Sequence, residues 1–187
     1  MTEFWIVLGA LLLIAFLASL VFRATRLDRL HNDVLRSRST LERLLASRAH
    51  LALDMVALGE FDPASAMIVA DAATRALDDQ RQLVPDGLGP DPVPESALGF
   101  AETRDRAVIE SELSHVLRDV LDDPESRRSD LATRLLDTWE RIVVARGLHD
   151  QKVELTRRLR SRLFVRIFRL AGRAPLPVPF EMDDRAP

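Results

Sequence analysis

The stretch FWIVLGALLLIAFLASLVFRATRLDRLHNDVLRSRSTLERLLASRAHLALDMVALG, residues 4–59, decides the fold of this chain. Its first part, from Phe4 to Phe22, carries no charged residue, and Ser19 is its only hydroxyl. A helix rises about 1.5 Å per residue, so this run just crosses a hydrocarbon core about 30 Å thick. The next proline is Pro63, so nothing breaks the helix after it leaves the lipid. The sequence therefore predicts a transmembrane helix at 4–22 that continues into a water-exposed domain.

The charges around this run predict its orientation. Residues 1–3 carry no basic side chain, whereas Arg23, Arg26 and Arg29 follow the run directly. The positive-inside rule then places residues 1–3 outside the cell membrane and the later domain in the cytoplasm, as in a single-pass protein. A cleaved signal peptide is the alternative. The missing basic n-region, the long apolar run and the absence of a small-x-small site before Arg23 favour an uncleaved anchor.

Composition limits what the rest of the chain can be. The 187 residues less the span leave about 165, enough for one domain with its own core. There is no cysteine, which excludes disulfides, thiolate metal sites and a lipoprotein anchor. Among the 26 basic residues only Lys152 is a lysine, so richness in arginine is not evidence for nucleic-acid binding. We expect no nucleic-acid partner.

The second part of the opening stretch predicts one amphipathic helix at 23–59. Its apolar residues fall at heptad spacing: Leu27, Leu30, Val34, Leu41, Leu44, Leu51, Met55 and Leu58, widened by Leu45, Ala52 and Val56. Ser37 and Arg48 interrupt the heptad, which favours packing within the chain over a long regular coiled-coil dimer. Gly59 is a typical residue to end the helix.

Three further helices are predicted at 62–83, 96–122 and 130–171. Asp62 before Pro63 is a start signal, as is Ser129 or Asp130 for the last helix. The apolar faces are Ala66, Val69, Ala70, Ala73, Ala76 and Leu77; then Val108, Ile109, Leu113, Val116, Leu117, Val120 and Leu121; then Leu131, Leu135, Trp139, Ile142, His149, Val153, Thr156, Leu163 and Ile167.

Loops separate these helices. Four prolines break the chain at 84–95, and a proline-rich tail at 174–187 is expected to be flexible. Each helix must bury one stripe. The predicted fold is therefore all-α, a transmembrane helix continuing into an antiparallel four-helix bundle over 23–173 with long first and last helices.

Two stretches resemble the LemA family of membrane-anchored helical proteins. LERLLASRAHLALDMVALG (41–59) is similar to the family's first helix, and ERIVVARGLHDQKVELTRRLRSRLFVRIFRLAGRAPLPVPFE (140–181) to its last helix and tail. The matching positions are Leu45, Arg48, Leu51, Met55, Val56, Arg141, Ile142, Ala145, Arg146, His149, Asp150, Phe180 and Glu181.

This chain departs from the family pattern and looks like a divergent member. Ala52, Leu53 and Asp54 replace a usual Ile-Pro-Asn, and His149-Asp150 stands where Tyr-Asn is typical. The resemblance implies an N-terminal anchor and a helical bundle. It supplies no catalytic residue and no cofactor.

The strongest enzyme-like signal is Glu112-x-x-His115, the spacing used in di-iron bundles. His115 lies far from the apolar stripe of its helix, however, so both residues are expected in water. His149 falls on the core side of its helix, where a lone histidine is most often a hydrogen-bonded core residue. No nucleophile elbow, Walker loop or dinucleotide fingerprint is present. We expect no catalytic residue, metal, cofactor or small-molecule substrate.

The end of the last helix is a candidate membrane surface. It interleaves arginines with phenylalanines, and we expect the following residues to lie near lipid: Arg157, Arg158, Arg160, Arg162, Phe164, Arg166, Phe168, Arg169 and Arg173. The predicted function is a non-enzymatic, membrane-anchored scaffold that contacts lipid and a protein partner of unknown identity. Two alternatives remain: an envelope protein that forms homo-oligomers through its first helix, and, more remotely, a metal-dependent helical-bundle enzyme.

Overall fold

The computed structural model describes residues 2–78, 106–122, 124, 126–161 and 177–187, and these residues contain four α-helices. They are α1 (Thr2–Ala57), α2 (Pro63–Asp78), α3 (Arg106–Val120) and α4 (Asp130–Arg160). Seven side chains of α1, those at 2, 3, 20, 23, 24, 27 and 28, are not among those described. The described ranges contain no strand, which confirms the prediction of an all-α helical bundle.

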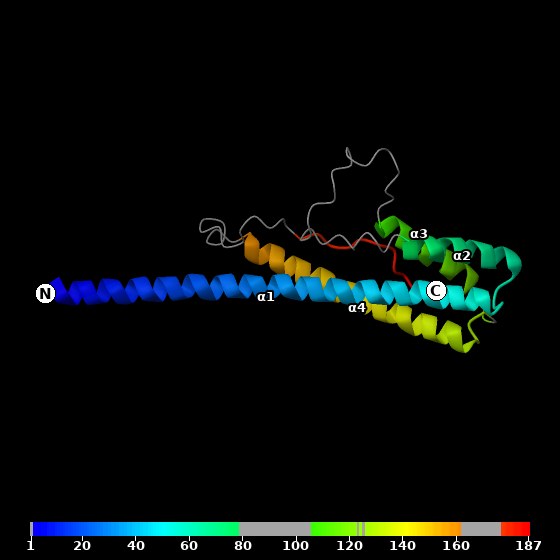
Figure 1. The fold of residues 1–187 in the computed structure, drawn as a ribbon, viewed down its shortest axis with the longest axis horizontal. Helices are drawn as coiled ribbons and strands as arrows, with labels where there is room; N and C mark the ends of the chain where they lie inside the picture. Colours follow the sequence, from blue (N-terminus) through cyan, green and yellow to red (C-terminus); the bar gives the residue numbers. More distant parts are fainter. Residues whose placement is uncertain (1, 79–105, 123, 125, 162–176) are drawn as a thin grey trace, which may run out of the picture.

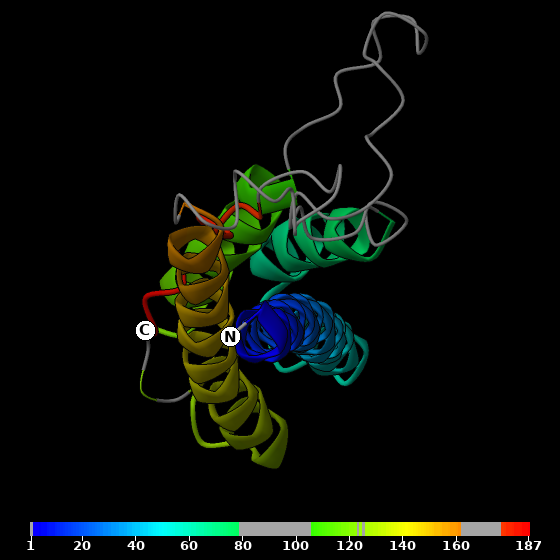
Figure 2. The same ribbon diagram turned by 90° about the vertical axis from the view of Figure 1, so that its left-hand side faces the viewer.

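α1 is the axis on which the other helices pack (Figure 1). It has 56 residues, or about 84 Å at 1.5 Å per residue. α4 returns along it in the opposite direction, while the shorter α2 and α3 cover the half of α1 that is far from the N-terminus. Seen along the rod, α4 and α2 lie on different sides of α1 (Figure 2). The N-terminal part of α1 extends beyond this bundle as a single helix.

α1 ends in a Schellman motif. Gly59 has φ 72°, a left-handed conformation that suits glycine because it has no Cβ. Its N–H donates to the carbonyl of Val56 (3.1 Å), and the N–H of Glu60 donates to the carbonyl of Met55 (3.1 Å). This confirms the predicted helix end.

The predicted start signals of two later helices are also confirmed. An Asp62 carboxylate oxygen accepts from the N–H groups of Ala64 (3.0 Å) and Ser65 (3.3 Å). Hydrogen bonds from Ser65 and Ala64 hold the pKa of Asp62 below its usual value. At the start of α4, the hydroxyl of Ser129 accepts from the N–H of Ala132 (2.9 Å).

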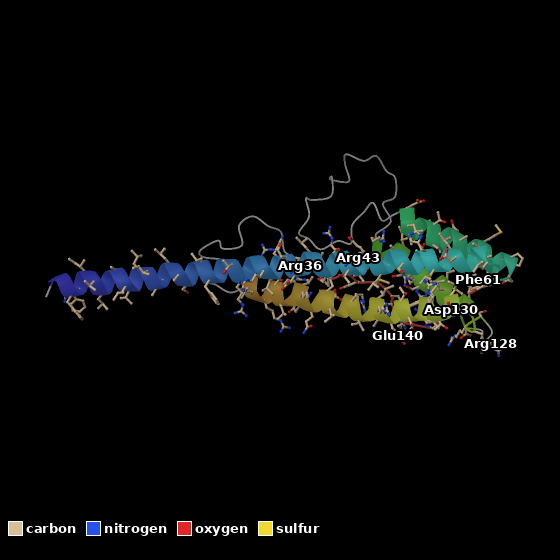
Figure 3. All side chains as sticks on the ribbon, turned by 60° about the horizontal axis from the view of Figure 1, so that its bottom comes forward. Arg36, Arg43, Phe61, Arg128, Asp130 and Glu140 are labelled. Carbon is tan, nitrogen blue, oxygen red and sulfur yellow. The ribbon has the colours of Figure 1, made fainter. Side chains whose placement is uncertain are left out.

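The same hydroxyl of Ser129 donates to the carboxylate of Glu60 (2.7 Å), so the ends of two interhelix connections are joined. Phe61, Arg128 and Asp130 all lie at this end of the rod, opposite the N-terminus (Figure 3). The linkage fixes where α1 stops relative to where α4 starts. It therefore sets the register in which the two long helices pack.

The main core contains residues from all four helices. Its buried members are Ala49, Leu51, Ala52, Met55, Val69, Ala72, Ala73, Ala76, Ile109, Leu113, Leu117, Leu121, Ala132, Leu135 and Trp139. The alanines of α2 have small side chains, which lets that helix approach its neighbours closely. Parts of all four predicted apolar faces therefore meet in this core.

Two of the described stripe residues were predicted to be buried and are exposed. Leu58 is 73% exposed because it follows the last helical residue, where the chain turns away from the core. Val108 is 47% exposed, since the buried line of α3 runs at i, i+4 spacing through Ile109, Leu113 and Leu117. Leu27, Leu163, Ile167 and the predicted helix ends at 83, 96 and 171 lie outside the described residues or side chains.

Side chains of the N-terminal part of α1 are apolar and exposed. Phe4 is 67% exposed, Leu12 64% and Phe22 70%. No helix within the described part of the chain is both long and apolar enough to span a membrane.

The C-terminal tail differs from the prediction of a flexible segment. Residues 177–187, here called the C-terminal segment, pack beside α3 and α4 (Figures 1 and 2). Phe180 is 1% exposed and Met182 7%. The physical reason is that alternate side chains of the segment are apolar and enter a second core cluster, as an extended chain allows.

Candidate functional site: a buried arginine and the docked C-terminal segment

Arg48 of α1 is fully buried in the middle of the apolar stripe. Its guanidinium donates to the carboxylate of Glu110 (2.8 Å), to the backbone carbonyl of Glu110 (3.2 Å) and to the hydroxyl of Ser114 (2.8 Å). Both partners lie on α3. A residue that interrupts the heptad of α1 is therefore what links α1 to α3.

A second arginine shares the carboxylate of Glu110. Arg106, one turn earlier on α3, places its guanidinium 2.6 Å from the other carboxylate oxygen. The side chains of Arg106 and Glu110 are 3% and 0% exposed. Two guanidinium groups and one carboxylate are thus enclosed together.

Trp139 of α4 completes this cluster. The guanidinium carbon of Arg48 lies 5.1 Å from the centre of its indole ring, a cation–π contact. Burial lowers the pKa of Arg48, and the charge of Glu110 opposes that effect. Because arginine keeps its proton even when buried, the cluster is a fixed ion network between three helices.

The chemistry of this network is positional. A guanidinium stays protonated near neutral pH, and the carboxylate that it binds is already paired with two guanidinium groups. Within the described residues, no group of three or more metal-ligating side chains could hold a metal ion. The arrangement fixes helices; it holds no proton-transfer pair.

His149 lies on the side of α4 that faces the core, as predicted, and is fully buried. Its Nδ1 is 3.1 Å from the hydroxyl of Ser37, which donates to the carbonyl of Val34 (2.8 Å). Ser37 is the other residue that interrupts the heptad of α1. Both interruptions are therefore polar links from α1 to another helix of the same chain.

The C-terminal segment is bound first through Asp184. Arg146 of α4 donates to both carboxylate oxygens of Asp184, at 2.6 and 2.9 Å. The indole N–H of Trp139 donates to the backbone carbonyl of Asp184 (2.9 Å). Trp139 therefore contacts the ion network with its ring and the chain terminus with its nitrogen.

The backbone of the segment is bound as well. Asp150 accepts from the N–H of Phe180 (3.1 Å), and Ser111 accepts from the N–H of Asp183 (2.9 Å). Arg118 of α3 donates to the carbonyl of Arg185 (2.8 Å). Backbone groups that would otherwise lose their water are thus satisfied by side chains of α3 and α4.

The carboxylate of Asp183 faces Arg118 and His115 of α3. Asp183 lies 3.3 Å from the guanidinium of Arg118 and 3.4 Å from His115. Hydrogen bonds from Arg185, together with the charges of Arg118 and Arg185, lower the pKa of Asp183 to about 2. The segment is therefore held by charge as well as by packing.

Apolar side chains anchor the same segment. Phe180 and Met182 enter a cluster with Leu41 and Leu45 of α1 and Ile142 of α4. Burying a side chain of this size contributes about 1.5–3 kcal/mol. We call the residues that receive the segment the docking surface; they are Leu41, Leu45, Ser111, Arg118, Trp139, Ile142, Arg146 and Asp150.

The structure brings several of the family-motif residues together. Arg146, Asp150 and Phe180 meet where the segment docks, beside Leu45 and Ile142. Leu51, Met55, Arg48 and His149 are buried, Val56 and Ala145 are half-buried, and Arg141 and Glu181 are exposed. The motif thus falls mainly in the core and at the docking surface.

The predicted membrane surface falls largely outside the described residues. Arg157 and Arg158 are exposed on the last turn of α4, and Arg160 is half-buried, which lowers its pKa by desolvation. Arg162, Phe164, Arg166, Phe168, Arg169 and Arg173 lie beyond the described range.

Glu112 and His115 are directed to different partners. Glu112 forms an ion pair with Arg75 of α2 (2.9 Å), and His115, 59% exposed, lies near Asp183. Exposure of His115 agrees with the prediction.

Sequence reasoning missed Arg106, Glu110, Ser114, Arg118, Trp139 as a donor, and the two aspartates of the segment. One signal was available. Arg106, Glu110 and Ser114 recur at i, i+4 spacing directly beside the apolar line of α3, and Arg48 stands within the apolar line of α1.

Comparisons with models of protein families, with curated proteins and with solved structures found no match to this chain.

Proposed function

We propose that this chain is a membrane-anchored, non-enzymatic helical bundle of the LemA type, which acts as a scaffold or interaction module at the cytoplasmic face. One observation carries the proposal: α1 continues without interruption from an exposed apolar run into the core of the bundle. Apolar side chains exposed along a helix mark a surface that another phase or a partner covers.

The span in this proposal is the whole run from Phe4 to Phe22, including Leu20, whose side chain is not among those described. At 1.5 Å per residue the run measures about 28 Å, close to the thickness of the hydrocarbon core. The arginines after the run support a cytoplasmic bundle in a single-pass protein of the cell membrane.

A scaffold role rests on how the polar groups are used. The buried charges of Arg48, Arg106 and Glu110 bind one another and fix three helices. A bundle whose helices are linked in this way, on a membrane-anchored helix, is suited to presenting a surface to a partner.

The alternatives gain no comparable support. Self-association through the first helix would need the apolar stripe that follows the span, but Val34, Leu41 and Leu45 of that stripe are already covered within the chain. A metal-dependent reaction would need Glu112 beside His115, whereas Glu112 is bound to Arg75.

The anchor is tested by placing charges in the run. We expect the full chain to stay in the membrane pellet after alkaline extraction. Leu12→Arg with Leu13→Arg should release it, since each arginine at the centre of a span costs about 2.5–3.5 kcal/mol. Leu58→Arg with Met67→Arg is the matched control, because both residues are exposed outside the run. Retention of the Leu12/Leu13 variant would refute the anchor.

Orientation and scaffolding need separate measurements. A reporter that works only in the cytoplasm should be active when it is fused after Pro187, and a reporter that works only outside the cell membrane should be inactive there. Proximity labelling from that position should enrich proteins that an anchor-only control, residues 1–30 fused to the same label, does not. If the two label sets coincide, the bundle has no partner and the scaffold role fails.

A further inference from the structure

The C-terminal segment is bound as a ligand, not as part of the helical framework. Its contacts come from side chains of α1, α3 and α4, and it supplies none of the backbone hydrogen bonds within those helices. Its outer edge is open to solvent, since Val178 is 40% exposed and the side chain of Arg185 82%. The segment can therefore leave or enter the docking surface without unfolding a helix.

Recognition of the segment is specific in sequence. Phe180 and Met182 fill the apolar cluster, and Asp184 meets Arg146 in a two-pronged ion pair. The backbone N–H of Phe180 and of Asp183 are each received by a side chain. An extended segment with the pattern Phe-x-Met-x-Asp therefore satisfies the whole surface at once.

We propose that the docking surface of one copy binds the C-terminal segment of a second copy, so that two chains pair by exchanging residues 177–187. Every copy carries both the surface and its matching segment, so the exchanged contacts are identical to those within one chain. Exchange of an identical element is a low-cost route to a dimer for this reason. The inference goes beyond the proposed scaffold role and depends on the bundle, not on the anchor.

Concentration decides between the two arrangements. A tethered segment faces its own surface at an effective concentration of about 1 mM, so a dilute chain binds its own segment. A second copy competes when chains are held close together. Exchange differs from pairing through α1, because it leaves the stripe of α1 inside its own bundle.

Arg146 and Asp184 allow a crossed-charge experiment with the full chain in detergent. Arg146→Asp places two acids together within one chain, and Asp184→Arg places two arginines together. Mixing the two variants restores an opposite-charge pair at both docking surfaces, but only between chains. The double variant restores the pair within one chain.

Each variant carries a different affinity tag, and co-purification measures pairing. We expect the mixture to pair at least about tenfold more than either variant with a differently tagged copy of itself, which corresponds to about 1.4 kcal/mol. The double variant should remain unpaired at the same concentration. Far-ultraviolet circular dichroism checks that all variants keep the wild-type helicity.

A second readout follows the segment itself. In a Trp5→Phe background only Trp139 emits, and its indole is in contact with Asp184. Its emission should differ from wild type in each single variant and return to wild type in the mixture and in the double variant. A mixture that stays unpaired while the double variant recovers would overturn the proposal. The proposal would also be overturned if a single variant paired with itself as strongly as the two variants pair in the mixture, because the contact would then lie elsewhere.

Discussion

The indole nitrogen of Trp139 lies 2.9 Å from the backbone carbonyl oxygen of Asp184, so a residue in the interior of α4 holds the end of the chain. The same ring contacts the buried guanidinium of Arg48 at 5.1 Å. The docked segment and the ion network are therefore neighbours through one side chain. A change at Trp139 is expected to affect both.

Trp139→Phe tests this connection. Phenylalanine keeps a ring under Arg48 but removes the donor to Asp184 and weakens the cation–π contact. We expect a loss of about 1–3 kcal/mol in the free energy of unfolding, from one hydrogen bond and part of one cation–π contact. Chemical unfolding in detergent, followed by helicity, measures it. Trp5→Phe, in the exposed apolar run, is the control and should cost nearly nothing.

The buried carboxylate is the critical member of the ion network. Glu110→Leu leaves the guanidinium groups of Arg48 and Arg106 buried without their anion, and should cost about 3–5 kcal/mol of unfolding free energy. Arg48→Met added to that variant removes one of the two excess charges. The double variant should therefore be more stable than Glu110→Leu alone.

Arg75→Ala is the matched control for that series. It breaks the ion pair with Glu112. The side chain of Arg75 is 39% exposed and that of Glu112 is 37% exposed, so we expect a loss of unfolding free energy within about 1 kcal/mol. If Glu110→Leu costs no more than Arg75→Ala, the buried network contributes little to stability.

Leu117 tests the assignment of the faces of α3. Its side chain is fully buried in the main core, so Leu117→Asp would put an unpaired carboxylate there and should cost several kcal/mol. Glu112→Ala and His115→Ala, on the outer face, should each cost about 1 kcal/mol or less. Thermal unfolding of the three variants compares them. Equal losses would mean that the faces are assigned wrongly.

The pKa of Asp183 predicts how acid releases the C-terminal segment. The folded value is about 2, below the ordinary 3.8, because of hydrogen bonds from Arg185 and the charges of Arg118 and Arg185. Arg185 belongs to the segment itself, so only the part of the lowered pKa that comes from Arg118 on α3 stabilises the docked state. That part is fully present above pH 3.8 and is lost as the pH falls toward 2.

Emission of Trp139 in the Trp5→Phe background measures this release between pH 6 and pH 1.5. Asp183→Asn keeps an oxygen that can accept hydrogen bonds but has no charge to lose. The emission of Trp139 should change less in the Asp183→Asn variant than in the chain that keeps Asp183, across the window from pH 3.8 to pH 2. Superimposable curves would show that Asp183 does not hold the segment.

Local signals made parts of this fold predictable from sequence. The Gly59 turn and the Asp62 and Ser129 caps depend on residues within a few positions, so the residue type alone indicates them. The apolar stripes were predictable because helical periodicity repeats over many turns. These two kinds of signal were sufficient for the helical order and the bundle.

The site depends on contacts that no local pattern contains. Arg48 and Glu110 are separated by 62 positions, and neither residue carries a mark of its partner in the sequence. An arginine in an apolar stripe is usually taken as an interruption, because its desolvation is costly unless a carboxylate meets it. The docked segment was missed for a related reason. Its alternation covers only Phe180, Met182 and Asp184, too few positions to separate from a proline-rich tail.

The arginines that end the last helix give the final prediction, which concerns lipid. In an antiparallel bundle this region returns toward the place where α1 leaves its apolar run, and Arg157 and Arg158 are exposed there. An arginine near an anionic leaflet contributes about 1 kcal/mol within a Debye length. A fragment from Thr25 to Pro187 should therefore bind anionic vesicles and bind neutral vesicles poorly.

Replacing Arg162, Arg166 and Arg169 with glutamine should weaken that binding by up to about 3 kcal/mol, on the order of a hundredfold, because three charges are lost. Arg36→Gln with Arg43→Gln on α1 is the control, since these arginines lie beside the bundle and away from the apolar run (Figure 3). Vesicle co-sedimentation measures binding, and circular dichroism checks that helicity is unchanged. Equal binding to neutral vesicles, or an undiminished affinity in the triple variant, would leave these arginines without a lipid role.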